Sequence, residues 1–324
     1  MSLTELCRAW NLSPLLSTWT PDSGTIHQTL LLKTVSGESY ALRTYRYDAT
    51  QRWRIVCEHA LIAYACAHGL PAMVPLPLST GETIFEHAGR FYALFPFATG
   101  HQSPRGQLST DEIAAMGRFL GELHCVLHGY PHDQVPQRSF TIDHAATLAR
   151  MDEVEAAIRL CSPLADRESL TLARLAQRRA WLMANRAPDA ADFLGLEQQV
   201  IHGDYQETNL FFANGRVSAI IDWDQSYVAP RAWEIVRTLH YTLKLEPVSC
   251  RIFLAAYRRI LSVEQEDLDA VAAAYGWMRA HDLWQYEELF IRGNQRLWAF
   301  MQPDGRFVPF VEQWAVLQEA LHEH

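Results

Sequence analysis

The chain has 324 residues, and at roughly 150 residues per domain this length suggests two domains or lobes. Hydrophobic residues make up 49% and charged residues 20%, values close to those of globular proteins, which excludes a disordered or fibrous chain. Lys and Arg number 28 against 37 Asp and Glu, and the net charge of −9 argues against a nucleic-acid-binding protein, because such proteins present a basic face.

Membrane insertion and secretion are not indicated by the sequence. No stretch reaches the roughly 18 uncharged apolar residues that a membrane-spanning helix needs. The N-terminus lacks the apolar core of a secretory signal. The six cysteines are scattered, without a C-x-x-C pair or a metal-ligand spacing, which favours free thiols in a reducing compartment. We therefore expect a cytoplasmic protein that does not act on a membrane.

The first hundred residues have the pattern of a small sheet with one helix. Two β-rich runs, Thr29–Thr34 and Ser39–Tyr45, flank a short turn and predict a hairpin. Arg52–His68 has apolar residues at helical spacing and ends before a glycine, as a helix does. Two further short strands are predicted at Thr83–His87 and Phe91–Phe95. This part of the chain therefore predicts a sheet and one main helix.

Beyond a loop at residues 100–106 the chain becomes helical. Ser109 and Glu112 have the spacing of a capping box, which marks the start of a helix. The change of character near residue 97 predicts an N-lobe of residues 1–97, a hinge at about 95–100 and a mostly helical C-lobe of residues 98–324. Helical periodicity recurs at residues 143–160, 168–186, 249–261, 266–280 and 281–300.

Residues 200–224 form an island of β pattern within the helical part. Asn214-Gly215 between apolar runs predicts a two-residue hairpin turn, because a type I′ turn needs positive φ at both positions. With this turn Ala213 pairs with Arg216. Continued pairing then places Asn209 opposite Ile220.

Three oxygen-bearing side chains are expected at the open end of this hairpin. Asn209 precedes the first strand, Asp222 follows the second, and Asp204 lies on the loop that leads in. Mg²⁺ prefers carboxylate and amide oxygens and keeps open positions for substrate phosphates. A carboxylate that is not a ligand can orient and deprotonate an attacking hydroxyl. The arrangement therefore favours phosphoryl transfer, and the plain alternative is an acidic surface turn.

The island also carries two motifs that resemble those of a known family. They are His202–Asn209 (HGDYQETN) and Ile221–Asp224 (IDWD), which are similar to the H-G-D-x₄-N and I-D-W-[DE] motifs of the aminoglycoside phosphotransferase/choline kinase-type family. The resemblance assigns no subfamily. It implies an α+β, two-lobed protein-kinase-like fold with an antiparallel-sheet N-lobe, one main N-lobe helix and a mostly helical C-lobe.

The same resemblance implies roles for single residues. Asp204 would be the catalytic base, and Asn209 and Asp222 would bind Mg²⁺. His202 would be a structural residue of the loop, and Asp224 would anchor the metal loop rather than bind metal.

The nucleotide is expected to bind at the N-lobe. Neither G-x-x-x-x-G-K-[ST] nor G-x-G-x-x-G occurs, which excludes a P-loop NTPase. Ser23 and Gly24, in the loop between the first two strands, are the expected phosphate-loop residues. By resemblance Arg43 stands where relatives carry the phosphate-binding lysine, with Glu58 as its partner. The alternatives are a surface arginine, a solvated Glu58, and Lys33 as the rival phosphate ligand.

The adenine position follows from the resemblance alone. Adenine would lie between the lobes against Phe211 and other apolar residues, and the hinge around Phe97 would read its edge. Pro96 in that hinge can donate no hydrogen bond. Each of these apolar residues is equally explicable as core.

The acceptor is expected against the C-lobe helices. One predicted helical stripe carries Trp284, Glu288 and Trp298. Aromatic faces attract cations and stack on sugars, and a carboxylate pairs with ammonium, so the stripe suits an amine or a sugar. The plain alternative is a second buried helix face. Glu234 stands where many relatives carry Asp, which leaves the subfamily open.

The sequence therefore predicts an ATP- and Mg²⁺-dependent phosphotransferase. It would transfer the γ-phosphate to a hydroxyl of a small metabolite such as an amino alcohol, an amino acid like homoserine, an aminoglycoside or a sugar. Neither nucleic acid nor membrane is expected as a partner, and the oligomeric state is open. The alternative is a catalytically silent nucleotide-binding regulator of the same fold, which the single glycine of the phosphate loop and Arg43 favour. A protein kinase is a third possibility, against which the lack of an A-P-E motif counts.

Overall fold

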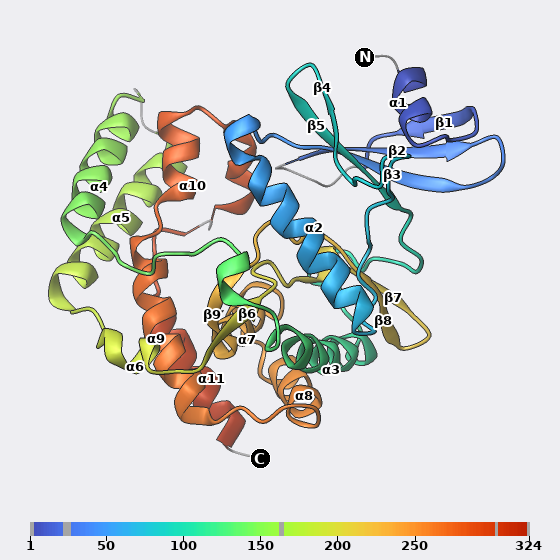
Figure 1. Cartoon of the computed structure of the whole chain (residues 1–324). Helices are drawn as coiled ribbons and strands as arrows, with labels where there is room; N and C mark the ends of the chain where they lie inside the picture. Colours follow the sequence, from blue (N-terminus) through green and yellow to red (C-terminus); the bar gives the residue numbers. More distant parts are fainter. Residues whose placement is uncertain (1–2, 22–26, 162–164, 302–303, 323–324) are drawn as a thin grey trace.

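A computed structural model of the chain describes all residues except 1–2, 22–26, 162–164, 302–303 and 323–324. The N-terminal part contains one antiparallel sheet with the strand order β1-β2-β3-β5-β4, together with two helices (Figure 1). The elements are α1 Leu3–Ala9, β1 Leu15–Trp19, β2 Gln28–Thr34, β3 Ser39–Thr44, the 3₁₀ turn η1 Ala49–Gln51, α2 Arg52–Ala67, β4 Phe85–His87 and β5 Arg90–Pro96.

The two faces of this sheet are covered by different helices. Successive side chains of a strand point to opposite faces, and β5 shows this alternation. Ala93 of β5 belongs to a buried cluster with Ile55 of α2. The next residue, Leu94, belongs to a cluster that includes Leu6 of α1. The sheet is therefore a layer between α1 and α2.

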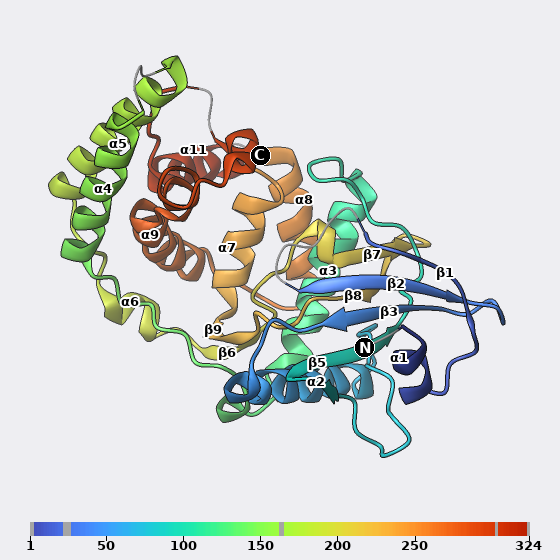
Figure 2. The same cartoon turned by 90° about the horizontal axis from the view of Figure 1, so that it is seen from above.

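The rest of the chain is mostly helical, with two small two-stranded sheets, β6–β9 and β7–β8. Figure 2 shows α4, α5, α9 and α11 gathered on the side of the molecule away from β1, β2 and β3. The helices are α3 Thr110–Leu127, α4 His144–Arg159, α5 Asp166–Ala184, α6 Ala190–Leu194, α7 Arg231–Tyr241, α8 Pro247–Arg258, α9 Gln265–His281, α10 Trp284–Tyr286 and α11 Phe310–His322. The strands are β6 Gln198–Ile201, β7 Leu210–Ala213, β8 Arg216–Ile220 and β9 Tyr227–Pro230. Short helical turns are η2 His132–Gln134, η3 Glu207–Asn209, the π-helical η4 Glu287–Ile291 and η5 Gln295–Phe300.

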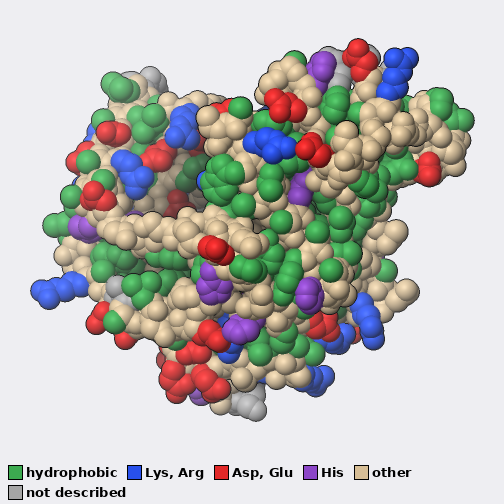
Figure 3. All heavy atoms as spheres, in the orientation of Figure 1, with side chains coloured by type: hydrophobic (Ala, Val, Ile, Leu, Met, Phe, Trp, Pro, Cys, Tyr) green, Lys and Arg blue, Asp and Glu red, His purple; other side chains and the backbone are tan. Residues whose placement is uncertain are grey.

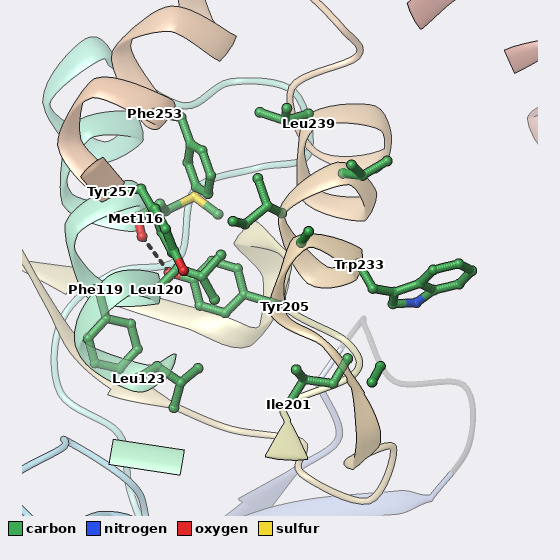
Figure 4. Packing of buried hydrophobic residues seen from close by; sticks show 14 of the residues in the cluster. Met116, Phe119, Leu120, Leu123, Ile201, Tyr205, Trp233, Leu239, Phe253 and Tyr257 are labelled. Carbon is green, nitrogen blue, oxygen red and sulfur yellow. Dashed lines mark hydrogen bonds between the residues drawn. The ribbon is translucent and has the colours of Figure 1, made fainter. Parts of the chain in front are cut away.

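The core of the helical part lies directly behind the β island. Figure 4 shows side chains of α3, α7 and α8 packed around Tyr205, which is fully buried. The Tyr205 hydroxyl donates a 2.8 Å hydrogen bond to the carbonyl oxygen of Met116 on α3. Because Tyr205 follows Asp204 directly, this core fixes the backbone at the residue predicted to be the catalytic base.

The predicted fold class is confirmed: the molecule has the α+β arrangement of an antiparallel sheet followed by a mostly helical part. The capping box at the start of α3 is also confirmed, because Ser109 accepts from the Glu112 backbone while Glu112 accepts from Ser109. The Glu112 side chain also accepts hydrogen bonds from His101 and Ser103, which ties the start of α3 to the preceding loop.

The single helix predicted over residues 281–300 is wrong. The chain forms α10, the π-helical η4 and the 3₁₀ turn η5 instead. The break before η5 falls at Gly293, whose φ of 72° belongs to the left-handed region that favours glycine. The stripe predicted to carry Trp284, Glu288 and Trp298 on one helix is therefore divided between three short elements.

The predicted register of the β7–β8 hairpin is right at the turn and wrong beyond it. Ala213 pairs with Arg216 as predicted, and Phe212 pairs with Val217. An irregularity then lets Phe211 pair with Ala219, so that Ser218 is an extra residue. As a result the Ile221 amide, not Ile220, faces Asn209 and donates to its carbonyl oxygen at 3.0 Å.

No helix among the described residues is both long enough and apolar enough to cross a bilayer.

Candidate active site

The loop that carries Asp204 is held by a buried carboxylate. Glu234 on α7 accepts hydrogen bonds from the backbone amides of His202 at 3.2 Å and Gly203 at 2.6 Å. Its carboxylate also lies 3.1 Å from Nε2 of the buried His124. Burial opposes ionisation, but the hydrogen bond from His124 and the surrounding positive charge hold the pKa of Glu234 below its ordinary value. Glu234 is thus the residue that fixes the turn after β6.

Gly203 is the position in this turn that requires a glycine. Its φ is 81°, in the left-handed region, and a Cβ there would collide with the carbonyl oxygen of Gln225. The loop and the segment after β8 therefore lie in direct contact. The neighbouring His202 strengthens this contact, because its Nε2 lies 3.1 Å from the Ile221 carbonyl oxygen.

Asp204 contacts three side chains. Arg237 of α7 donates from Nη2 to Oδ1 at 2.6 Å. Gln206 and Asn209 donate to Oδ2 at 2.8 and 2.9 Å. The Asp204 carboxylate is partly buried, with 19% of its side chain exposed, and it is held in one orientation from both sides. A carboxylate held in this way can receive a proton from a hydroxyl bound next to it.

Asn209 and Asp222 provide the oxygens that could bind a cation. The Asn209 amide nitrogen donates to both the backbone and the side chain of Asp204. The amide oxygen is therefore the side-chain atom that can bind a cation. Asp222 has a φ of 66°, an uncommon conformation for a residue other than glycine. Its Oδ1 accepts from Arg43 at 3.0 Å. Burial raises the pKa of Asp222, and the charge of Arg43 opposes that shift.

The donor set fits Mg²⁺. Within the residues that the structure describes, no three His, Cys, Asp or Glu side chains gather into a metal-binding group. The protein ligands would therefore be one amide and one carboxylate, from Asn209 and Asp222. Mg²⁺ is bound in this way, by one or two carboxylates together with waters and substrate phosphates.

Arg43 joins α2 to the end of the hairpin. Nη1 donates to Oε1 of Glu58 at 2.8 Å, and Nη2 donates to Asp222 at 3.0 Å. Burial raises the pKa of Glu58 to about 7, against the opposing charge of Arg43. The positive charge of Arg43 is itself stabilised, because Glu58 and Asp222 raise its pKa against the effect of burial. Arg43 and Glu58 are thus paired as predicted, and Arg43 is not a surface residue.

One carboxylate oxygen of Asp224 is held by contacts to the N-terminal part. Its Oδ2 lies 3.1 Å from Nε2 of the buried His27 and accepts from the Tyr47 hydroxyl at 3.4 Å. Burial would raise the pKa of Asp224, but the hydrogen bond and charge of His27 lower it. These contacts agree with an anchoring role for Asp224.

The remaining predicted nucleotide residues are placed as follows. Ser23 and Gly24 lie outside the described residues. Phe97, directly after β5, is 42% exposed, and its ring lies 6.4 Å from that of Trp19 on β1. Phe211 lies half-buried on β7. Lys33, the rival phosphate ligand, is exposed and pairs with Ser39 next to the turn that follows β2.

Two of the three predicted acceptor residues, Glu288 and Trp298, already have partners within the protein. Glu288 forms an ion pair with Arg292. The guanidinium carbon of Arg167 lies 4.3 Å from the centre of the Trp298 ring. Trp284 is 51% exposed. Figure 3, which has the orientation of Figure 1, shows a hollow in the surface between the α4–α5 pair and α2.

Arg237 was not predicted from the sequence, and Glu234 was noted there only as a departure from the family pattern. Both lie on α7, three residues apart, and neighbours at this spacing share a helix face. The spacing of Glu234 and Arg237 on one helix face is therefore the signal in the sequence that points to Arg237.

This arrangement defines a class of protein. A sheet-containing part and a helical part meet at a held carboxylate, an amide–carboxylate pair and a paired arginine, as in phosphotransferases with a protein-kinase-like fold. The model of the phosphotransferase enzyme family matches residues 18–281. The chain belongs to this family and is a phosphotransferase enzyme.

Individual relatives are distant. Stress response kinase A of Salmonella choleraesuis (strain SC-B67) is 23% identical over 255 residues, which are 72% of this chain and 70% of that protein. A protein of Salmonella typhimurium named serine/threonine protein kinase RdoA matches with the same identity and coverage. Among solved structures, spectinomycin phosphotransferase APH(9)-Ia, in complex with ADP and spectinomycin, has a TM-score of 0.67 at 15% identity and covers 98% of both chains. A microcompartment-associated aminopropanol kinase has a TM-score of 0.58 at 14% identity, covering 98% of this chain and 93% of its own.

Proposed function

We propose that the protein is an ATP- and Mg²⁺-dependent kinase of a small molecule, and that it phosphorylates a hydroxyl group. The observation that carries the proposal is the shared hydrogen bonding of Asp204 and Asn209 next to Asp222, which Arg43 connects to Glu58. Similar structures hold ADP, or AMP-PNP with Ca²⁺, which supports a nucleotide and a divalent cation as ligands of this fold.

In the proposed reaction the acceptor oxygen forms a bond to the γ-phosphorus while the bond from that phosphorus to the β–γ bridging oxygen breaks. The hydroxyl proton passes to the Asp204 carboxylate, and ADP leaves. Gln206 and Asn209 orient the carboxylate for this transfer. A bound Mg²⁺, held by Asn209 and Asp222, would offset the negative charge of the phosphates.

Arg43 has the second role in the proposal. Its guanidinium group offers a planar fork that binds phosphate oxygens, and Glu58 holds it in place. Ser23 and Gly24 would approach the phosphates, and Phe97 and Phe211 would contact the base. Trp284, Glu288 and Trp298 remain predicted acceptor residues.

The organisation and setting of the protein remain predictions as well. We propose a lobe boundary after residue 97 with the hinge at residues 95–100, which the end of β5 at Pro96 supports. A cytoplasmic location and a small hydroxyl compound as the partner follow from the sequence alone.

A protein acceptor is the second candidate. It is favoured by the name of the Salmonella typhimurium relative, a serine/threonine protein kinase, although that protein is only 23% identical. A silent nucleotide-binding regulator is the alternative outside catalysis. The retained Asp204, with three side chains that orient it, counts against the regulator, because nucleotide binding alone needs no base.

The test is a coupled ADP-release assay with Mg-ATP and Mg-GTP on the wild-type chain and on Asp204→Asn. The acceptors are amino alcohols, hydroxy acids, sugars, aminoglycosides and a serine-rich protein. Asp204→Asn should lower kcat by roughly 10²–10⁴-fold, the usual contribution of a positioned base. Titration of nucleotide binding should give nearly the same affinity for both proteins. Equal turnover by the variant would remove Asp204 as the base, and no acceptor-dependent ADP release would favour the regulator.

A further inference from the structure

Two arginines from different helices meet on one tyrosine ring beside Asp204. The guanidinium carbon of Arg237 on α7 lies 5.1 Å from the centre of the Tyr241 ring, and that of Arg279 in the last turn of α9 lies 5.3 Å from the same centre. Arg237 is also the residue that donates to Asp204. A molecule whose hydroxyl reaches Asp204 is therefore next to a pair of guanidinium groups.

The surroundings add further positive charge. Arg105 donates to Gln206 at 3.2 Å, and Lys244 donates to the Tyr241 carbonyl oxygen. The nearby His240 reflects this environment, because burial first, and then the charges of Arg279, Lys244 and Arg237, lower its pKa to about 3. The charges that oppose the two arginines are Asp204 itself and Asp282, which pairs with Arg279.

The acidic groups on the expected acceptor side are not free to bind an amine. Of the carboxylates of η4, Glu287 lies 3.5 Å from Arg150, and Glu288 is paired with Arg292. The Trp298 ring has the Arg167 guanidinium over it. A cationic acceptor would have to displace these arginines, whereas an anionic acceptor at Arg279 would displace one carboxylate, that of Asp282.

Building on the proposed function, we propose that the acceptor carries a carboxylate close to the hydroxyl that is phosphorylated, and that Arg279, beside Arg237, binds this carboxylate. A guanidinium fork matches a carboxylate in two parallel hydrogen bonds. Arg279 is the better placed of the two. Its partner Asp282 is 38% exposed and can return to water, whereas Arg237 is held by Asp204. A phosphate group has related chemistry and is a separate arm of the test.

The acceptor panel consists of pairs that differ only in the carboxylate. They are homoserine and 3-aminopropan-1-ol, serine and ethanolamine, and glycerate and ethylene glycol, with glycerol 3-phosphate as the phosphate arm. Binding to the AMP-PNP complex is measured by calorimetry, and turnover by ADP release with Mg-ATP. The proteins are the wild type, Arg279→Gln, Arg279→Lys and, as a matched loss of one positive charge, Arg159→Gln on the exposed face of α4.

For the wild type we expect at least one acid to bind more tightly than its decarboxylated partner. Arg279→Gln should weaken that binding roughly 10- to 100-fold, the range for a hydrogen bond to a charged group, and should raise KM rather than lower kcat. The decarboxylated partner should be unaffected. Arg279→Lys should recover part of the affinity, and Arg159→Gln should behave as wild type.

The inference is overturned if no acid binds better than its partner, if Arg279→Gln weakens both members of a pair equally, or if the phosphate compound or a protein alone is accepted. In each of these outcomes an acceptor still supports ADP release. Failure of the proposed function gives a different result: carboxylates bind and their binding depends on Arg279, but no compound in the panel supports turnover.

Discussion

On the proposed nucleotide side of the site, Arg43 lies between Glu58 and Asp222, and Asp224 lies against His27. On the proposed acceptor side, Arg237 and Arg279 share a tyrosine ring, and each pairs with one carboxylate. The first region joins its ions into a connected set, since Arg43 pairs with both Glu58 and Asp222. In the second region Arg237 and Arg279 each have one carboxylate partner, and the partner of Arg279, Asp282, is exposed enough to give way to a ligand.

Loss of the Arg43 charge should have the largest effect. Arg43→Gln leaves the Glu58 and Asp222 carboxylates without their cation, and breaking a buried pair costs about 3 kcal/mol or more. We expect lower stability in urea unfolding and a raised KM for ATP, with the KM for the acceptor unchanged. Arg43→Lys is the matched control and should recover part of both. If the acceptor KM changes instead, the two sides are not separate in the way described.

Glu234→Gln should affect both sides by weakening the loop that they share. The amide cannot accept from His202, Gly203 and His124 together, so that one buried donor loses its partner, at a cost of about 1–3 kcal/mol. We expect lower kcat with both substrates near their wild-type KM. A change in the KM of only one substrate would show that the loop belongs to that side.

Arg237→Gln tests the acceptor side alone. It removes the 2.6 Å ion pair with Asp204, both of whose side chains are partly exposed, at a cost of about 1 kcal/mol. We expect a fall in kcat/KM for the acceptor, while ATP affinity measured by calorimetry stays as in the wild type. Weaker ATP binding would contradict the assignment of Arg237 to the acceptor side.

The smallest effect concerns Glu112, behind the site. Burial would raise its pKa, but hydrogen bonds from Ser103, Ser109 and His101 lower it to about 2 from an ordinary value of 4.5. Stability from Glu112 is therefore full above 4.5 and is lost as the pH falls towards 2. Glu112→Gln keeps the capping geometry but removes the negative charge that strengthens its hydrogen bonds, at a cost of about 1 kcal/mol near neutral pH. The Tm difference from wild type should shrink on acidification; a difference that does not change with pH would rule out this linkage.

The sequence was informative where a function depends on residues close together in the chain. The two motifs predicted Asp204, Asn209 and Asp222 as neighbours, because a tight turn at Asn214-Gly215 fixes their separation. The register beyond Phe212 could not be predicted, since the bulge at Ser218 depends on contacts outside the hairpin. Its hydroxyl donates to the Thr99 carbonyl oxygen at 2.6 Å, more than a hundred residues away in the chain.

The acceptor side was least predictable for the same reason. Helical periodicity continues through residues 281–300, but the backbone turns at Gly293 and divides the stripe. Arg237 and Arg279 lie on separate helices, and nothing in the local pattern of either shows that they meet. Their meeting is a property of how α7 packs against α9.

The β7–β8 hairpin is attached to the segments on both of its sides. Phe212 exchanges backbone hydrogen bonds of 3.0 and 2.8 Å with His101, just after the predicted hinge. At the other end the Ile220 amide donates to the Pro71 carbonyl oxygen at 3.0 Å, in the segment that follows α2. If the sheet rotates relative to the helices during a catalytic cycle, the hairpin lies at the pivot of that rotation and does not itself move. The spacing of Asn209 and Asp222 should then stay constant through opening and closing.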